Sequence, residues 1–148
     1  MTLVDANVLL YAINTASPQH EAARTWLDHA LSSSTRVGLP WLSLLAFVRI
    51  ATHPSVFPAP LSTLQALEVI EAWCRPPNVV HPEPSRTFAT TFTKTLTAGG
   101  ARGNLVNDAY LAALAIEYGA TVVTFDRDFA RFDGVTVSTP GAPHDLSR

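Results

Sequence analysis

The chain has 148 residues, of which 47% are hydrophobic and 15% are charged, and its formal net charge is −2. These values exclude a disordered chain, predict one domain with a sizeable core, and give no electrostatic case for a nucleic-acid partner. The single cysteine, Cys74, excludes an internal disulfide and a cysteine-based zinc site.

The first half of the chain alternates strand and helix patterns. The clearest helix is expected over 17–33, where Ser17 can cap the first turn and apolar residues recur at helical spacing. The helix at 60–74 opens with a capping box, Ser62 followed three positions later by Gln65. Its expected apolar stripe consists of Leu64, Leu67, Ile70, Trp73 and Cys74. In chain order, the expected elements are a strand at 2–4, a helix from about residue 7, a helix at 17–33, a strand at 35–40, and helices at 41–53 and 60–74.

The second half repeats the alternation. A glycine-rich loop at 97–104 precedes a strong helix that Gly119 ends, because glycine readily adopts the left-handed conformation of a helix terminus. The expected elements are a strand at 78–82, helices at 85–96 and 105–119, and strands at 120–125 and 134–138. Strands that alternate with helices predict a parallel sheet of four to five strands covered on both faces, a three-layer α/β/α domain. We expect this domain over 1–140, with fraying from Thr139 and a flexible tail at 141–148.

Neither a secretory leader nor a membrane span is predicted. A charged, helix-like pattern follows soon after Met1, unlike a signal peptide. The longest uncharged apolar run, 37–48, is too short to cross a bilayer. We therefore expect a cytoplasmic protein without a membrane partner.

Four of the twelve acidic residues stand in apolar surroundings. Asp5 follows the apolar "TLV", Asp126 and Asp128 follow "ATVVTF", and Asp108 lies on an otherwise apolar line of the helix 105–119. A buried carboxylate is costly unless it is paired or bound to a metal. Because the carboxyl ends of parallel strands share one edge of a sheet, these side chains are expected to meet there.

Each carboxylate also has an ordinary structural explanation. Asp5 can cap the helix that follows it. Asp126 and Asp128 would lie on one face if the extended backbone continued, but they can equally be turn residues with Asx hydrogen bonds. Asp108 can be a first-turn charge favoured by the helix dipole.

Carboxylates that share a cleft repel one another unless a cation is present. Oxygen ligands without Cys or His select Mg²⁺ or Mn²⁺, and the five histidines of the chain show no metal-ligand spacing. An acidic Mg²⁺ site is typical of phosphoryl transfer and phosphodiester hydrolysis, where the ion activates water.

Two segments, "LVDANVLLYA" and "NDAYLAALAIEYGATVVTFDRDF", resemble the PIN-domain nucleases and, within them, the VapC toxins of bacterial toxin–antitoxin pairs. The resemblance runs from Thr2 to about Pro140. It implies a PIN-like α/β/α fold and an endoribonuclease that depends on Mg²⁺, for which Mn²⁺ can substitute. It also implies RNA as the substrate, a VapB-type antitoxin and a homodimer.

The resemblance further implies residue roles. By position, the metal ligands would be Asp5, Asp108 and Asp126, with Asp128 as a further ligand or a water-orienting base. The residues that would support these carboxylates through hydrogen bonds are Asn7, Asn104 and Thr124. Basic residues that flank the motifs can contact RNA phosphates or be solvated charges: Arg49, Lys94, Arg102 and Arg127.

One position departs from the family pattern. Most members carry a Glu in the second long helix, three residues before an Arg, whereas Ala46 stands three residues before Arg49 here. No acidic residue occurs from Arg36 to Ser62. Asp128 and waters can compensate, metal binding can be weak, or the chain can be inactive. The alternative function is therefore a PIN-fold module that binds RNA or an antitoxin without cutting.

Two other classes fit the acidic residues less well. A phosphoacceptor receiver domain needs a lysine after its last core strand, and the only lysine, Lys94, lies before that strand. A metal-dependent phosphatase of small substrates agrees with the chemistry but not with the motif.

Overall fold

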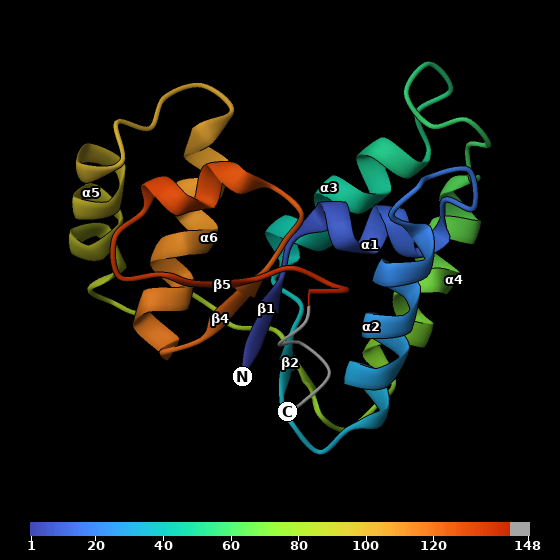
Figure 1. Cartoon of the computed structure of the whole chain (residues 1–148), viewed down its shortest axis with the longest axis horizontal. Coiled ribbons are helices and arrows are strands. Elements are labelled where there is room, and N and C mark those ends of the chain that lie inside the picture. Colours follow the sequence, from blue (N-terminus) through green and yellow to red (C-terminus); the bar gives the residue numbers. More distant parts are fainter. Residues whose placement is uncertain (143–148) are drawn as a thin grey trace.

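The computed structural model describes residues 1–142 and has a five-stranded sheet at its centre (Figure 1). All neighbouring strands are parallel, in the order β3-β2-β1-β4-β5. The strands are β1 (Thr2–Val4), β2 (Val37–Gly38), β3 (Val79–Val80), β4 (Thr121–Val123) and β5 (Thr136–Ser138). The central strand β1 thus pairs with β4, which comes from the opposite end of the sequence.

Helices cover both faces of this sheet. The helices are α1 (Ala6–Ile13), α2 (His20–Ser32), α3 (Trp41–Ala51), α4 (Thr63–Cys74), α5 (Phe88–Ala98) and α6 (Leu105–Tyr118), with a 3-10 helix η1 (Arg127–Arg131). In Figure 1, α5 and α6 lie on one side of the sheet and α1 to α4 on the other. Strand side chains alternate between the two cores: Val4 and Val123 face the first four helices, and Leu3 and Val122 face α5 and α6. The predicted three-layer α/β/α fold is confirmed.

Several predicted helix ends are confirmed. Ser62 and Gln65 form the capping box of α4, and Gly119 ends α6 with a positive φ of 60°. At α2 the prediction is wrong in detail, because Ser17 lies in a turn and the helix begins only at His20. The backbone amide of His20 donates to the Ser17 carbonyl within that turn, which delays the first regular helical turn.

The expected apolar stripe of α4 is also partly wrong. The buried residues of this helix are Ala66, Ile70 and Trp73, whereas Leu64 and Leu67 are 67% and 47% exposed. Both leucines lie roughly a quarter to half a turn away from Ala66 around the helix, so the face that packs on α3 turns them outward. The structure therefore leaves apolar side chains on the surface of α4.

The end of the described chain packs more closely than expected. Pro140 is buried, and the Ala142 amide donates to the Thr139 carbonyl, so the chain does not fray immediately after β5. The remainder of the expected tail, 143–148, lies outside the described residues. Across 1–142, none of the helices has the length and hydropathy needed to cross a membrane.

Candidate active site

A cleft of about 340 Å³ opens beside the carboxyl end of β1, between α1, α3 and α6. Two predicted carboxylates line it, Asp5 directly after β1 and Asp108 in the first turn of α6. The α3 wall includes Ala46, the position where the resemblance leads one to expect a Glu. The other polar residues that line the cleft are Ser43, Arg49, Asn104 and Asn107.

Hydrogen bonds fix the Asp5 carboxylate on both oxygens. Oδ1 accepts from the Ala6 amide at 2.7 Å, which makes Asp5 the N-cap of α1. Oδ2 accepts from the Thr124 hydroxyl at 2.7 Å and from the Asn7 side-chain amide at 3.1 Å. The capping explanation is therefore correct, and the same carboxylate faces the cleft.

The partners of Asp5 hold one another in place. The side chain of Asn7 donates to the Thr124 hydroxyl at 3.1 Å and accepts from the Phe125 amide at 3.2 Å. Thr124 is fully buried, and its hydroxyl oxygen also accepts from the Asp126 amide at 3.0 Å. This network joins the ends of β1 and β4, so folding itself orients the Asp5 carboxylate.

The pKa values of the two cleft carboxylates, Asp5 and Asp108, are both raised, but through different surroundings. Burial raises the pKa of Asp5, an effect that the Thr124 and Ala6 hydrogen bonds oppose. The pKa of Asp108 rises from 3.8 to about 6, first through burial and then through the negative charges of Asp5, Asp126 and Asp128. The positive charge of Arg131 partly offsets that rise. The other three predicted carboxylates therefore lie within electrostatic reach of Asp108.

Asp126 and Asp128 do not continue an extended strand. The strand β4 ends at Val123, and Asp126 caps η1 by accepting from the Asp128 amide at 2.8 Å. Asp128 is exposed and forms an ion pair with Arg131 at 3.9 Å. The turn explanation is correct for this pair, and the cleft is lined by neither residue.

The cleft fits a hard cation by the chemistry of its donors. Mg²⁺ commonly uses one or two protein carboxylates and keeps several waters, a pattern that Asp5 and Asp108 can satisfy. Within residues 1–142, however, no three His, Cys, Asp or Glu side chains are gathered closely enough to form a ready metal site. The close approach of Asp5, Asp108 and Asp126 that we expected is therefore not present in this arrangement.

The PIN domain family matches residues 2–135 of the sequence. The chain belongs to this family. It is 48% identical over 142 residues to Ribonuclease VapC37 of Mycobacterium tuberculosis, covering 96% of this chain and 99% of that protein. It is 36% identical over 140 residues to Ribonuclease VapC33 of the same species, covering 95% and 98%. Within the PIN family, the chain therefore groups with the VapC proteins.

Solved structures of VapBC and VapC proteins share the fold at low sequence identity. The VapBC2 complex of Rickettsia felis bound to a promoter DNA fragment matches with a TM-score of 0.67 at 17% identity, covering 94% of this chain and 98% of that one. VapC20 of M. tuberculosis, described as a sarcin-ricin loop cleaving toxin, matches with a TM-score of 0.63 at 17% identity, covering 88% and 93%. These similarities support the fold assignment.

The other predicted site residues of this PIN domain are spread around the cleft. Asn104 lines it, but its side chain neither caps α6 nor donates to a carboxylate among the described residues. Arg49 lines the cleft, and it is exposed. Arg102 and Arg127 are exposed and lie outside the lining. Lys94 is exposed on α5.

Sequence reasoning missed two polar residues of the cleft, Ser43 and Asn107. Asn107 directly precedes Asp108, so its place in the family motif was a usable signal. Ser43 stands alone in an apolar helix, three residues before Ala46, and only its helical phase relative to that position could have indicated it.

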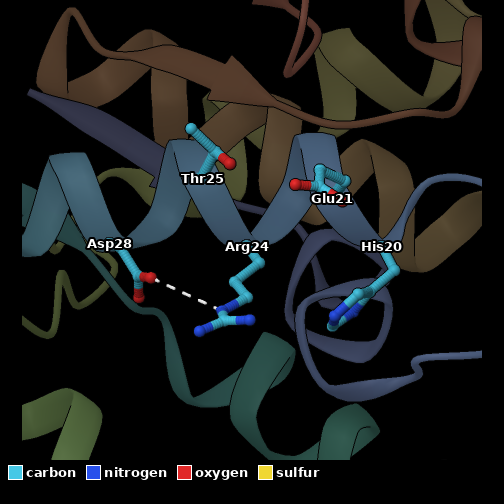
Figure 2. Close-up of a pocket in the computed structure, with 5 residues that line it drawn as sticks. All are labelled: His20, Glu21, Arg24, Thr25 and Asp28. Atoms are coloured by element: carbon cyan, nitrogen blue, oxygen red, sulfur yellow. Dashed lines mark ion pairs between the residues drawn. The ribbon is translucent and has the colours of Figure 1, made fainter.

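A second hollow, of about 370 Å³, runs along the outer face of α2 (Figure 2). Figure 2 shows an ion pair there between Arg24 and Asp28, which measures 3.7 Å. All five lining residues come from this one helix: His20, Glu21, Arg24, Thr25 and Asp28. This is the solvated face of an amphipathic helix, and it gathers no groups from elsewhere in the fold.

Proposed function

We propose that this PIN-domain chain is an Mg²⁺-dependent endoribonuclease and the toxin of a type II toxin–antitoxin pair. One observation carries the proposal: Asp5 and Asp108, from distant parts of the sequence, line one cleft. The 48% identity to a protein named a ribonuclease supports the choice of RNA as the substrate. A cytoplasmic location follows from that substrate.

In this proposal Asp5 and Asp108 hold the cation, and Mn²⁺ can replace Mg²⁺. When bound, the ion supplies an activated water and neutralises charge on the transition-state oxygens. Asn7 and Thr124 keep the Asp5 carboxylate oriented toward the cleft through the hydrogen bonds described above. Asp126 completes the site through its negative charge, which already acts on Asp108.

The remaining charged residues have more distant roles. Asp128, exposed beside Asp126, acts through its charge or orients water, and Arg131 balances it. Arg49 contacts the phosphate next to the bond that is cut, because it is the basic residue among those that line the cleft. Arg102 and Arg127, both exposed, contact phosphates farther along the RNA.

The proposed partners are a VapB-type antitoxin and a second copy of the chain. Two of the three tryptophans, Trp26 and Trp73, are buried in the core. Trp41 and Leu45 on α3 are 48% and 63% exposed, and Leu64 and Leu67 on α4 are exposed as well. We expect a complex to cover part of this apolar surface, with a basic antitoxin side chain directed at the acidic cleft.

Sedimentation of the isolated chain tests the homodimer. A dimer is expected at micromolar concentration. A chain that stays monomeric at that concentration would contradict this part of the proposal.

A second candidate function is a PIN-fold module that binds RNA or antitoxin without cutting. Two observations favour it: Ala46 in place of a carboxylate, and the lack of a gathered three-ligand group within residues 1–142. Both functions predict binding, but only the first predicts RNA cleavage that EDTA abolishes.

The deciding experiment compares RNA cleavage by the wild-type chain and by Asp108→Asn in Mg²⁺. The Asn side chain keeps the shape but loses the charge, so the rate should fall on the order of a hundredfold or more. Asp28→Asn is the matched control, because Asp28 is exposed on α2, outside the cleft, and should leave the rate unchanged. Cleavage by Asp108→Asn at the wild-type rate would overturn the assignment. RNA binding by the wild-type chain with no cleavage would favour the binding module.

A further inference from the structure

Ser43 is a buried hydroxyl without a partner in the part of the chain that the structure describes. It is 3% exposed, and its side chain forms no hydrogen bond with any of residues 1–142. The other two buried polar side chains there are both hydrogen-bonded: Thr95 donates to the Thr91 carbonyl at 2.9 Å, and Thr124 belongs to the Asp5 network. A buried unpaired hydroxyl is costly, so Ser43 requires a partner that the chain itself does not supply.

The usual partner of a helical hydroxyl is the carbonyl four residues earlier. Thr52, Thr93 and Thr97 all donate to that carbonyl. For Ser43, in the first turn of α3, the residue four positions earlier is Leu39, which precedes the N-cap Pro40 and is not part of the helix; its carbonyl accepts from Nδ1 of His81 at 2.8 Å. The first turn of α3 therefore offers Ser43 no helical carbonyl four residues earlier, and the hydroxyl remains unpaired among the described residues.

The position of Ser43 indicates where its partner comes from. Ser43 lines the cleft together with Asp5 and Asp108. Ala46, which follows Ser43 by about one helical turn, lines it as well. The side of the cleft formed by α3 therefore carries a hydroxyl group, from Ser43, but no carboxylate, because residue 46 is an alanine.

We propose that Ser43 is a positioning residue whose hydroxyl oxygen accepts a hydrogen bond from a water molecule of the cation held by Asp5 and Asp108. The inference rests on the proposed function. A cation bound through two carboxylates keeps most of its waters, and each of these waters donates hydrogen bonds to nearby oxygen atoms. Ser43 supplies such an oxygen where residue 46 has only a methyl group.

The test measures binding of Mn²⁺ alone to the wild-type chain and to Ser43→Ala, by electron paramagnetic resonance. We expect the affinity of Ser43→Ala to fall about tenfold, as for other residues that orient metal-bound water. The metal-free variant should be as stable toward urea as the wild type, or more stable, because it no longer buries an unpaired hydroxyl. A merely structural Ser43 predicts the opposite pattern, with lower stability and unchanged affinity.

Thr95→Val is the matched control. It also removes a buried hydroxyl from a helix, but Thr95 lies on α5, outside the cleft. Its stability should fall, because a hydrogen bond is lost, while its Mn²⁺ affinity should match the wild type. A rescue variant, Ala46→Glu in the Ser43→Ala background, should restore the affinity by returning an oxygen to the α3 wall. If Ser43→Ala does not fold, Ser43→Cys keeps nearly the same volume with a much weaker acceptor and should show the same loss.

The outcomes separate the two proposals. Equal Mn²⁺ affinity of the wild type, Ser43→Ala and Ser43→Cys overturns the role of Ser43 and leaves the nuclease proposal standing. A wild-type chain that binds no Mn²⁺ overturns both.

Discussion

The two walls of the cleft differ in how their polar groups are satisfied. On the strand wall, Asp5 has hydrogen bonds to both carboxylate oxygens, and Asn7 and Thr124 are bonded to each other. On the helix wall, the side chains of Ser43 and Asp108 form no hydrogen bond with the residues that the structure describes. Folding alone satisfies the polar groups of the strand wall, whereas the side chains of Ser43 and Asp108 on the helix wall have no hydrogen-bond partner among the described residues.

Because of this difference, the strand wall stabilises the metal-free protein, whereas the helix wall becomes favourable only when a cation is bound. The hydrogen bonds of the strand wall stabilise the folded chain before any ligand arrives. The burial and the mutual repulsion that raise the Asp108 pKa to about 6 destabilise the folded chain with Asp108 charged, until a cation neutralises that charge. Substitutions that remove hydrogen bonds of the strand wall should therefore lower stability, whereas removal of the Ser43 hydroxyl or of the Asp108 charge should leave stability unchanged or raise it.

Thr124→Val should give the largest change in stability. It removes the hydroxyl that donates to Asp5 and accepts from Asn7 and from the Asp126 amide, all at a fully buried position. We expect the free energy of unfolding to fall by about 2–3 kcal/mol, measured by urea denaturation without metal. Thr95→Val, which loses a single hydrogen bond, should cost about 1 kcal/mol. Equal losses in the two variants would contradict a special role for the Asp5 network.

Asp108→Asn should shift stability in the opposite direction by a smaller amount. Removing one charge from the acidic group relieves repulsion in the metal-free protein at pH 7.5. Because Asp108 is partly solvated and its interactions are screened, we expect a gain of about 1 kcal/mol, or a few degrees in Tm. Calorimetry in EDTA measures this gain, and a lower Tm than that of the wild type would show that Asp108 is structural.

The pH dependence of that gain follows from the sign of the pKa shift. The folded-state pKa of about 6 lies above the ordinary value of 3.8, so the folded chain binds more protons than the unfolded chain in this window. The contribution of Asp108 therefore makes the wild type less stable as pH rises from about 4 to 6, and the full cost is present above that window. The Tm difference between Asp108→Asn and the wild type should vanish near pH 4 and reach its maximum by about pH 7. A difference that does not change with pH would contradict this electrostatic origin.

Ala46→Glu should have the smallest effect on stability. It adds a carboxylate to the helix wall, whereas Asp108→Asn removes one. A new carboxylate on the helix wall adds repulsion in the metal-free state, and we expect a loss of about 0.5 kcal/mol. Saturating Mg²⁺ should reverse that loss, and the Mg²⁺ affinity measured by calorimetric titration should rise several-fold. An unchanged affinity would show that residue 46 does not contribute to metal binding.

The sequence predicted the layered fold because strand and helix periodicities differ along nearly the whole chain. It failed where tertiary packing selects one of two possible faces. In α4, Leu64 and Leu67 fit a helical apolar pattern as well as Ile70 does, but α3 approaches from the side of Ala66. Local periodicity contains no information about which side a neighbouring helix will occupy.

For the candidate site, the sequence predicted that four aspartates meet, but Asp126 and Asp128 do not line the cleft. Asp5 and Asp108 line the cleft as their place in the motif suggested. Asp128 follows a turn in which Asp126 accepts from the Asp128 amide, an arrangement that the sequence offered as one of two alternatives without deciding between them. Ser43 had no sequence pattern of its own, because its importance depends on its burial and on its place in the first turn of α3, where no helical carbonyl precedes it by four residues.

The hydrogen bond between Thr124 and Asp5 spans 119 positions of the chain, so it has a consequence for synthesis as well as for the finished molecule. On the ribosome, β1 and Asp5 emerge early, but their partners in β4 and beyond it emerge only when the domain is nearly complete. Contacts of such long sequence separation form late in folding. A nascent or truncated chain that ends before β4 therefore has Asp5 without the network that orients it. The order in which the polypeptide is made delays assembly of the cleft until almost the whole domain is available to fold.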